Sequence, residues 1–543
     1  MKRGDGRLTH ELLPMVSIDS VSNTESSDAV AVAADDPGPR DACGVFGVWA
    51  PGEEVSKLAY FGLYALQHRG QESAGIAVSD GDGIVVYKDM GLVAQVFDER
   101  HLATLTGHLA IGHTRYSTTG SSNWENAQPT FRHTADGSIA LGHNGNLINT
   151  GELARLAAES ELARGDTMLP GFGGPVATSD TDLVTTLLAN HPERSLEKAA
   201  LDILPLLRGA FSFVFMDEST LYAARDPQGI RPLVLGRLER GWVVASESAA
   251  LDIVGASYVR EVEPGELIAI DEHGLRAQLF AEADPKGCIF EYVYLARPDT
   301  SIAGRSVHEA RVEVGRRLAR QSPTDADLVI PVPESGTPAA IGYAQESGIP
   351  YAQGLVKNAY VGRTFIQPSQ TIRQLGIRLK LNPLRHVIAG KRLVVVDDSI
   401  VRGNTQRALV RMLREAGAAE VHVRISSPPV KWPCFYGIDF ATRAELIANG
   451  LAVDEICQSV GADSLAFITL DELIEATTVP SERLCTACFT GQYPVALPNP
   501  EALGKHLLEG YERDSTATDL AADVDGLTSL TAASGAADAL RHP

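Results

Sequence analysis

Short apolar segments separated by polar turn residues fill the chain between about residues 43 and 283. Three pairs of segments have the spacing of β-hairpins: 75–78 with 84–87, 210–215 with 221–224, and 233–235 with 242–245. Apolar residues at helical spacing interrupt them at 55–67, 182–189 and 196–207. The pattern predicts an antiparallel α+β domain over this region.

Beyond about residue 320, short apolar strands alternate with helices. Strands are expected at 327–331, 392–396 and 421–425, and a helix is expected at 405–416, where Gly417 ends it. Parallel strands need crossover connections, which are usually helices. The alternation therefore predicts an α/β domain with a mainly parallel sheet.

Polar stretches flank these two patterned regions. Residues 17–41 and the residues from Asp514 onward consist mostly of small and polar side chains. Such segments bury too little apolar surface to offset the entropy of ordering them. We expect a disordered leader over residues 1–42, with Met15 as an alternative translation start, and a disordered tail over 513–543.

Composition narrows the class of protein. The 543 residues include 47 Lys and Arg against 69 Asp and Glu, a formal net charge of −22. This balance argues against nonspecific nucleic-acid binding and a basic membrane-surface role. No run approaches the roughly 18 apolar residues of a membrane helix, and six cysteines in this length do not form a secreted disulfide framework. We expect a cytoplasmic protein.

Two adjacent carboxylates, Asp397 and Asp398, follow the strand expected at 392–396. Open α/β sheets bind ligands at this end of a strand. The loop after it contains Gly403, and its N–H groups and the following helix N-terminus can hold a phosphate. Paired carboxylates suit ribose hydroxyls and Mg²⁺. The alternative is a solvated Asp-Asp turn, but strand, loop, glycine and helix in register favour a binding site.

Cys43 lies at the boundary between the polar leader and the first apolar segment. A cysteine made N-terminal carries its own base, because an α-amino group has a pKa of roughly 7.7–8.0. The alternative is a small buried hydrophobe in a first strand, which is the usual role of a free cysteine. The position of Cys43 alone does not decide between them.

Three further segments favour a nucleophile that acts on an amino-acid amide. Arg115 offers a guanidinium suited to bidentate carboxylate binding. Asn144 and Gly145 supply an amide side chain and a backbone N–H, which can form an oxyanion hole. Asp180 lies before an expected helix and can hold an ammonium group, although Ser179-Asp180 also reads as a helix N-cap.

Four cysteines remain to be explained: Cys288, Cys434, Cys485 and Cys488. Two residues separate the last pair, so both thiolates can reach one metal centre. By chemistry alone, a zinc site with four cysteines and a redox pair at Cys485 and Cys488 are both possible. Cys457 has no matching partner and reads as a buried structural thiol.

The loop after residue 396 resembles the phosphoribosyl pyrophosphate loop of type I phosphoribosyltransferases. The resemblance implies that Asp397 and Asp398 bind the ribose and Mg²⁺, and that a serine after the preceding strand, Ser335, joins the metal site. The residues implied for the 5-phosphate are Ser399, Arg402, Gly403, Asn404 and Thr405.

Residues 43–280 resemble the N-terminal-nucleophile glutaminases, the class II glutamine amidotransferases, which are αββα sandwiches. The resemblance implies Cys43 as nucleophile, Arg115 on the glutamine carboxylate, and Asp180 rather than Asp182 on its amino group. It also implies that Asn144 and Gly145 form the oxyanion hole. Family leaders are usually about a dozen residues long, so a leader of 42 residues departs from the pattern.

Together the segments over residues 43–510 resemble the iron–sulfur branch of the glutamine phosphoribosylpyrophosphate amidotransferases. The resemblance implies a [4Fe–4S] cluster on the four cysteines, and a lid over the substrate with Lys357 and Arg363. It also implies feedback inhibition by purine nucleotides and a homotetramer. The expected domains are 43–283 for the glutaminase, 284–480 for the transferase, and 481–512 for a cluster-binding segment with a helix.

The activity implied is the transfer of ammonia from glutamine to phosphoribosyl pyrophosphate, giving phosphoribosylamine in the first step of purine synthesis. One alternative is a glutaminase that aminates another acceptor, such as fructose 6-phosphate or aspartate. Another is a non-catalytic, cluster-bearing nucleotide sensor. The loop from Asp397 to Thr405 counts against the first alternative, and intact Cys43, Arg115 and Asn144 count against the second.

Overall fold

A computed structural model describes residues 43–116, 122–163, 179–358, 380–438 and 443–498. Within these ranges the chain forms an antiparallel sandwich, followed by a domain with a parallel sheet. The expected leader, the expected tail and the helix expected before the tail lie outside the described residues. Among the helices in these ranges, none is long and apolar enough to cross a membrane.

Two antiparallel sheets form the first domain. In sheet order, the described strands of one sheet are β11 (Ser257–Glu261), β9 (Val234–Leu238), β10 (Gly241–Ala245), β1 (Gly44–Trp49), β4 (Leu109–Arg115), β2 (Ser73–Ser79) and β3 (Ile84–Met90). Those of the other are β13 (Gly274–Leu279), β12 (Glu266–Asp271), β8 (Leu221–Arg225), β7 (Gly209–Met216), β6 (Ser138–Leu147) and β5 (Thr130–His133). The pairs β2–β3, β7–β8 and β9–β10 confirm the three expected hairpins.

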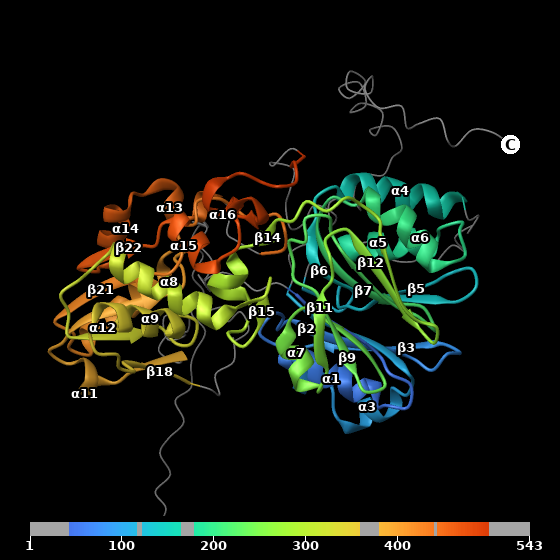
Figure 1. Cartoon of the computed structure of the whole chain (residues 1–543), viewed down its shortest axis with the longest axis horizontal. Coiled ribbons are helices and arrows are strands. Elements are labelled where there is room, and N and C mark those ends of the chain that lie inside the picture. The colour runs from blue at the N-terminus through green and yellow to red at the C-terminus, as the bar shows by residue number, and fades with distance from the viewer. Residues whose placement is uncertain (1–42, 117–121, 164–178, 359–379, 439–442, 499–543) are drawn as a thin grey trace, which may run out of the picture. The chain divides into compact units, whose positions relative to one another are not determined.

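Alternating side chains on the strands produce four layers. Val45 of β1 belongs to the core between the sheets, whereas Phe46 and Val48 pack with the helices of the first sheet. Those helices are α1 (Val55–Ala65), α2 (Val93–Val96), α3 (Glu99–Thr104) and α7 (Ser248–Ile253). The second sheet is covered by α4 (Thr150–Ala163), α5 (Asp180–Ala189), α6 (Leu196–Ile203) and η1 (Leu204–Leu206) (Figure 1). This αββα sandwich confirms the predicted fold.

The second domain is built on four described parallel strands. Their order is β17 (Leu328–Pro331), β20 (Arg392–Asp397), β21 (Glu420–Ile425) and β22 (Ser464–Phe467). Successive residues of β20 enter opposite cores: Val394 packs with α8 and α9, and Val395 packs with α12 and α14. The helices are α8 (Val307–Gln321), α9 (Thr337–Ser347), α12 (Asn404–Glu415), α14 (Val453–Val460) and α15 (Leu470–Thr477). The mainly parallel α/β sheet is confirmed.

Short elements join the main ones. The described two-stranded pairs are β14 (Gly287–Cys288) with β23 (Leu484–Cys485), β15 (Ser301–Ile302) with β16 (Arg305–Ser306), and β18 (Leu355–Lys357) with β19 (Leu381–Pro383). The short helices are η2 (Glu291–Leu295, a π-helix), α11 (Arg385–Ile388), η3 (Arg443–Glu445), α13 (Ile447–Gly450), η4 (Ser481–Arg483) and α16 (Ala487–Thr490). Because β14 and β23 pair in parallel, the segment before α8 is tied to the C-terminal part of the described chain.

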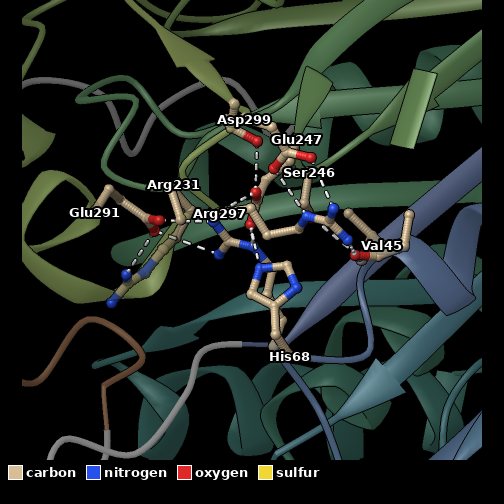
Figure 2. Close-up of polar contacts among 12 residues, drawn as sticks. Val45, His68, Arg231, Ser246, Glu247, Glu291, Arg297 and Asp299 are labelled. Carbon is tan, nitrogen blue, oxygen red and sulfur yellow. Dashed lines mark hydrogen bonds and ion pairs between the residues drawn. The ribbon is translucent and has the colours of Figure 1, made fainter. Parts of the chain in front are cut away.

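Four buried charged residues, Arg69, Glu247, Glu291 and Arg231, form what we call the buried ion network, and Figure 2 labels the last three. Arg69 Nε donates to Glu247, and its Nη2 donates to Glu291 at 2.6 Å. Glu291 also accepts from Arg231 Nη1 at 3.2 Å. Burial alone would raise the pKa of Glu247, but Arg69 and His68 outweigh it and hold that pKa well below its usual value. The network joins the sandwich to η2, which leads into α8.

Helices α8 and α9 approach each other through two glycines, and this contact yields a test of the packing. A Cβ added at Gly342 would lie 1.9 Å from the carbonyl oxygen of Val312, and one at Gly315 would lie 1.9 Å from that of Ala339. We expect Gly342→Ala to lower the free energy of unfolding by about 1–3 kcal/mol or more, because the helices must separate.

Urea-induced unfolding followed by circular dichroism measures the change. Gly83→Ala is the matched control, since a Cβ there meets nothing within 4 Å, and we expect its effect to stay within about 0.5 kcal/mol. Equal unfolding midpoints for the two variants would contradict the close helix contact.

Candidate functional site

Cys43 lies immediately before β1, in the middle of the first sheet. The strand pairs antiparallel with β4, so that Gly44 is opposite Thr114 and Cys43 reaches the end of β4. The Cys43 thiol donates to the carbonyl oxygen of Tyr116 at 3.2 Å, and the Tyr116 N–H lies 3.4 Å from the sulfur. Cys43 is therefore held against the strand that carries Arg115.

Burial raises the pKa of the Cys43 thiol to about 11. Arg115 and the hydrogen bond from Tyr116 lower this pKa, whereas Glu72 and Asp180 raise it. The net direction means that the thiol stays protonated at neutral pH while Ala42 is attached. A neutral thiol is a weak nucleophile, so the reaction needs a base beside the sulfur.

Arg115 and Asp180 both lie close enough to Cys43 to interact with it electrostatically. Arg115 is buried at the end of β4, and its Nη1 lies 3.9 Å from the carboxylate of Glu72. Burial lowers the pKa of Arg115, and Cys43, Glu72 and Asp180 oppose this change. The structure thus brings together the cysteine, the cation and the acid that the sequence predicted for the glutamine site.

The N-terminus of α5 separates the roles of its two acids. Ser179 is the N-cap and accepts from the Asp182 N–H at 3.2 Å, so the capping interpretation holds for Ser179. Asp180 is buried and accepts from the Leu147 N–H at 3.0 Å, whereas Asp182 pairs with Arg132 at 2.8 Å. Of these two acids, Asp180 is therefore the one that interacts electrostatically with Cys43.

Asn144 and Gly145 lie in the middle of β6. Asn144 is fully buried, and within the described residues neither Nδ2 nor Oδ1 of its amide has a hydrogen-bond partner. Buried amides without partners are rare because they lose their hydration. Gly145 has φ +148°, and a Cβ there would lie 2.0 Å from the carbonyl oxygen of Ala210. Such a fixed backbone and an unused amide suit an oxyanion hole.

Asp397 and Asp398 lie at the carboxyl end of β20, as predicted. The Asp398 N–H donates to Asp397 at 2.9 Å, and the Ser399 hydroxyl donates to Asp398. Ser335 also hydrogen-bonds to the Asp398 carboxylate, which brings the three expected metal ligands to one place. Burial raises the pKa of both aspartates, and Ser335 and Ser399 lower that of Asp398.

The loop from 399 to 403 runs directly into α12. Gly403 adopts φ +81°, and a Cβ there would lie 2.7 Å from Ile447 Cδ1. Asn404 and Thr405 form the first turn of the helix. Arg402 pairs with Glu445 at 3.3 Å. The first turn of α12 therefore follows the end of β20 through a backbone that requires glycine, as expected for a phosphate-binding loop.

The expected lid is described only at its start. Lys357 ends β18 with an exposed side chain, and its Nζ lies 4.0 Å from Glu334. Arg363 and the rest of the expected lid lie outside the described residues.

Two buried polar residues at this site were not predicted from the sequence. Gln406 donates to Asp397 through Nε2, and its Oε1 has no partner within the described ranges. The sequence feature that could have identified Gln406 is its position three residues before Leu409, on the apolar face of the helix. Arg311, buried on α8, lies near enough to Asp398 to interact with it electrostatically.

The four cysteines singled out in the sequence lie in one core. Cys288 pairs with Cys485 in the β14–β23 register, and Cys434 accepts from the Tyr436 N–H at 3.4 Å. Burial raises the pKa of Cys485 and Cys488, and interactions with Cys288 and Cys434 raise both further. In the described ranges, no three His, Cys, Asp or Glu side chains are placed to share one metal ion. Cys457 bonds instead to Ala462, away from this core.

Comparison with known proteins supports both halves of the site. Residues 113–252 match the family described as "Glutamine amidotransferase domain", and residues 306–426 match the family described as "Phosphoribosyl transferase domain". The chain is similar to a solved Bacillus subtilis structure, "glutamine phosphoribosylpyrophosphate (PRPP) amidotransferase complexed with ADP and GMP". The TM-score is 0.78 at 45% identity, and the match covers 86% of this chain and 100% of the other.

Two relatives carry the name amidophosphoribosyltransferase. The protein of Mycobacterium tuberculosis H37Rv is 66% identical over 496 residues, which cover 89% of this chain and 93% of the relative. That of Mycobacterium leprae is 64% identical and covers 93% of this chain and 92% of the relative. This chain therefore belongs to the amidophosphoribosyltransferases, the enzymes of the first step of purine biosynthesis.

Proposed function

We propose that this chain hydrolyses glutamine at Cys43 and transfers the ammonia to C1 of phosphoribosyl pyrophosphate, giving 5-phosphoribosylamine, glutamate and pyrophosphate. The observation that carries the glutaminase part is the fully buried Asn144 amide, which has no partner within the described residues. An amide reserved in this way suits an oxyanion that forms only during reaction. The family assignment weighs against fructose 6-phosphate or aspartate as acceptor and against a non-catalytic sensor.

In the glutaminase half, the Cys43 sulfur attacks the side-chain amide carbon of glutamine. The C–S bond forms, and the C–N bond breaks with proton transfer to the nitrogen. Ammonia departs, and a γ-glutamyl thioester remains on Cys43. Arg115 binds the α-carboxylate, Asp180 binds the α-ammonium group, and Asn144 with the Gly145 N–H stabilises the oxyanion. Water then cleaves the thioester and releases glutamate.

Removal of the leader at the Ala42–Cys43 bond would supply the base. A free α-amino group has a pKa of roughly 7.7–8.0 and would stand on the same residue as the thiol. In the intact chain burial instead holds the pKa of that thiol at about 11. We therefore propose residues 1–42 as a propeptide and the new N-terminus as general base.

In the transferase half, Asp397, Asp398 and Ser335 supply the oxygen donors that Mg²⁺ prefers. Mg²⁺ held there would neutralise charge on the departing pyrophosphate. Ser399, Arg402, Gly403, Asn404 and Thr405 would hold the 5-phosphate at the start of α12. Lys357 and Arg363 would close over the substrate, which limits hydrolysis of the activated sugar.

Contacts between the two halves support internal passage of ammonia. Asn146, two residues beyond Asn144, donates to the carbonyl oxygen of Phe435 at 3.0 Å. A Cβ added at Gly437 would lie 3.0 Å from the backbone of Gly145. Strand β6, which carries Asn144 and Gly145, thus contacts a segment of the transferase half directly. This contact supports a short path for ammonia between the two halves.

We further propose a [4Fe–4S] cluster on Cys288, Cys434, Cys485 and Cys488. Four thiols in one core suit such a cluster. From the family assignment we also propose inhibition by purine nucleotides, a homotetramer and a cytoplasmic location. The solved B. subtilis relative, which is complexed with ADP and GMP, supports nucleotide inhibition.

The central test separates the two nitrogen sources. In the active enzyme we expect Asn144→Ala to reduce glutamine-dependent formation of phosphoribosylamine about 10²–10³-fold, because the oxyanion loses a donor. Activity with added ammonia should be unchanged. Asn190→Ala, at the C-terminus of α5, is the matched control. Equal losses with both nitrogen sources, or none with glutamine, would refute the assigned role.

The state of Cys43 has its own test. In the full 543-residue chain, alkylation of Cys43 by iodoacetamide should be slow at pH 7 and rise about tenfold per pH unit until pH approaches 11, as the buried thiol ionises. Peptide mass spectrometry measures the rate. A chain that begins at Cys43 should react much faster at pH 7.5. Fast labelling of the intact chain at pH 7 would count against the propeptide mechanism.

Metal analysis tests the cluster. Anaerobically purified protein should contain about four iron atoms per chain and absorb broadly near 400 nm. Cys434→Ser should lose both signals, whereas Cys457→Ser should retain them, since Cys457 lies away from the cysteine core. Zinc without iron in the parent protein would overturn the cluster.

A further inference from the structure

Arg231 is a fully buried arginine beside the cysteine core. It lies between β8 and β9, and its Nε donates to the carbonyl oxygen of Tyr436 at 2.8 Å. Its Nη1 donates to Glu291 at 3.2 Å, and Figure 2 shows the two side chains next to each other. Two of the three guanidinium nitrogens are thus accounted for.

The third nitrogen, Nη2, is buried and has no acceptor among the described residues. An arginine side chain cannot discard its charge to avoid this loss of hydration, because its pKa is too high. Buried donors without partners are uncommon and call for an explanation. The unused N–H groups of Arg231 therefore point to an acceptor that the described residues do not supply.

Two of the four cysteines lie next to the groups that hold Arg231. The Cys288 N–H donates at 3.1 Å to the carbonyl oxygen of Ile230, the residue before Arg231. The Tyr436 N–H, beside the carbonyl that accepts from Arg231, contacts the Cys434 sulfur. Burial alone would lower the pKa of Arg231, but Cys288, Glu291 and Cys434 together raise it. Arg231 is therefore close enough to Cys288 and Cys434 to interact with both electrostatically.

We propose that Arg231 donates through Nη2 to a sulfur of the iron–sulfur cluster and supplies a buried positive charge beside it. The inference rests on the proposed cluster and adds a residue outside its ligand set. Four thiolates make the cluster anionic, and reduction adds a further negative charge. A cation and an N–H···S bond stabilise the reduced form most in a low-dielectric core.

The buried ion network explains why this residue is an arginine. Glu291 is itself held by Arg69, which also bonds to Glu247, so the carboxylate cannot follow a displaced guanidinium. A planar fork can contact Glu291, Tyr436 and a sulfur at once, whereas a lysine ammonium presents one compact charge. Arg231 is a positioning and electrostatic residue for the cluster.

The test uses the full chain, purified anaerobically, as parent, Arg231→Gln, Arg231→Lys and Arg424→Gln. Arg424 is a buried arginine on β21 that donates to Ser322 and Ser464, and its variant is the matched control. Iron content, the rate of bleaching near 400 nm in air, and the reduction potential are measured for each.

We expect the parent and the control to share one potential and one bleaching rate. Arg231→Gln should have a more negative potential and bleach several-fold faster, and Arg231→Lys should be intermediate because it keeps the charge but not the fork. A folded Arg231→Gln chain without iron, restored by Arg231→Lys, supports the same role. If Arg231→Gln does not fold, the reduction potential of the Arg231→Lys cluster tests the role of Arg231.

Potentials and bleaching rates equal to those of the parent in both Arg231 variants would overturn the role of Arg231. Absence of iron from the parent would instead overturn the cluster, so the two failures are distinct.

Discussion

The buried salt bridges of Arg69 with Glu247 and Glu291 are the constraint on which the structure of both halves of the molecule depends. Ions buried this deeply are stable only when each is paired, since removal of one partner typically costs about 3–5 kcal/mol. Glu247 lies next to Ser246, whose hydroxyl accepts from the Val45 N–H in the strand that follows Cys43. Glu291 begins η2, and Arg311 of α8 donates to carbonyl groups of that segment and interacts electrostatically with Asp398. Strand β1 and helix α8 are thereby tied to one set of charges.

Much of the fold was readable because its strands are strongly patterned. The hairpin at residues 73–90 and the strand at 392–397 show alternation or a continuous apolar run, and each lies within a few residues of its expected bounds. The strand β6 was recognised only as a motif, because Gly142, His143 and Asn144 give it no apolar alternation. The strand β22 was not anticipated either, since only Phe467 of its four residues is buried.

The chemistry of the site was predictable where a residue type has few other uses. Asp397-Asp398 with Gly403, and Asn144-Gly145, are combinations that a plain core or turn does not require. Gln406 and Arg311 escaped notice because each is a polar residue within an otherwise ordinary helix pattern. Their importance comes from which strand end the helix faces, and that is set by packing between distant segments. The same holds for Arg231, whose partners lie 60 and 205 positions away.

The contact between Gly145 and Gly437 bears on how such enzymes arise by domain recombination. Two backbones meet there without side chains, so the strand that carries Asn144 lies directly against the main chain of the other domain. A glutaminase domain moved to a different acceptor domain would lose this backbone contact and would need another one that is equally close. Each domain can be recognised separately in the sequence. Neither can be exchanged by itself, because the two domains share this contact.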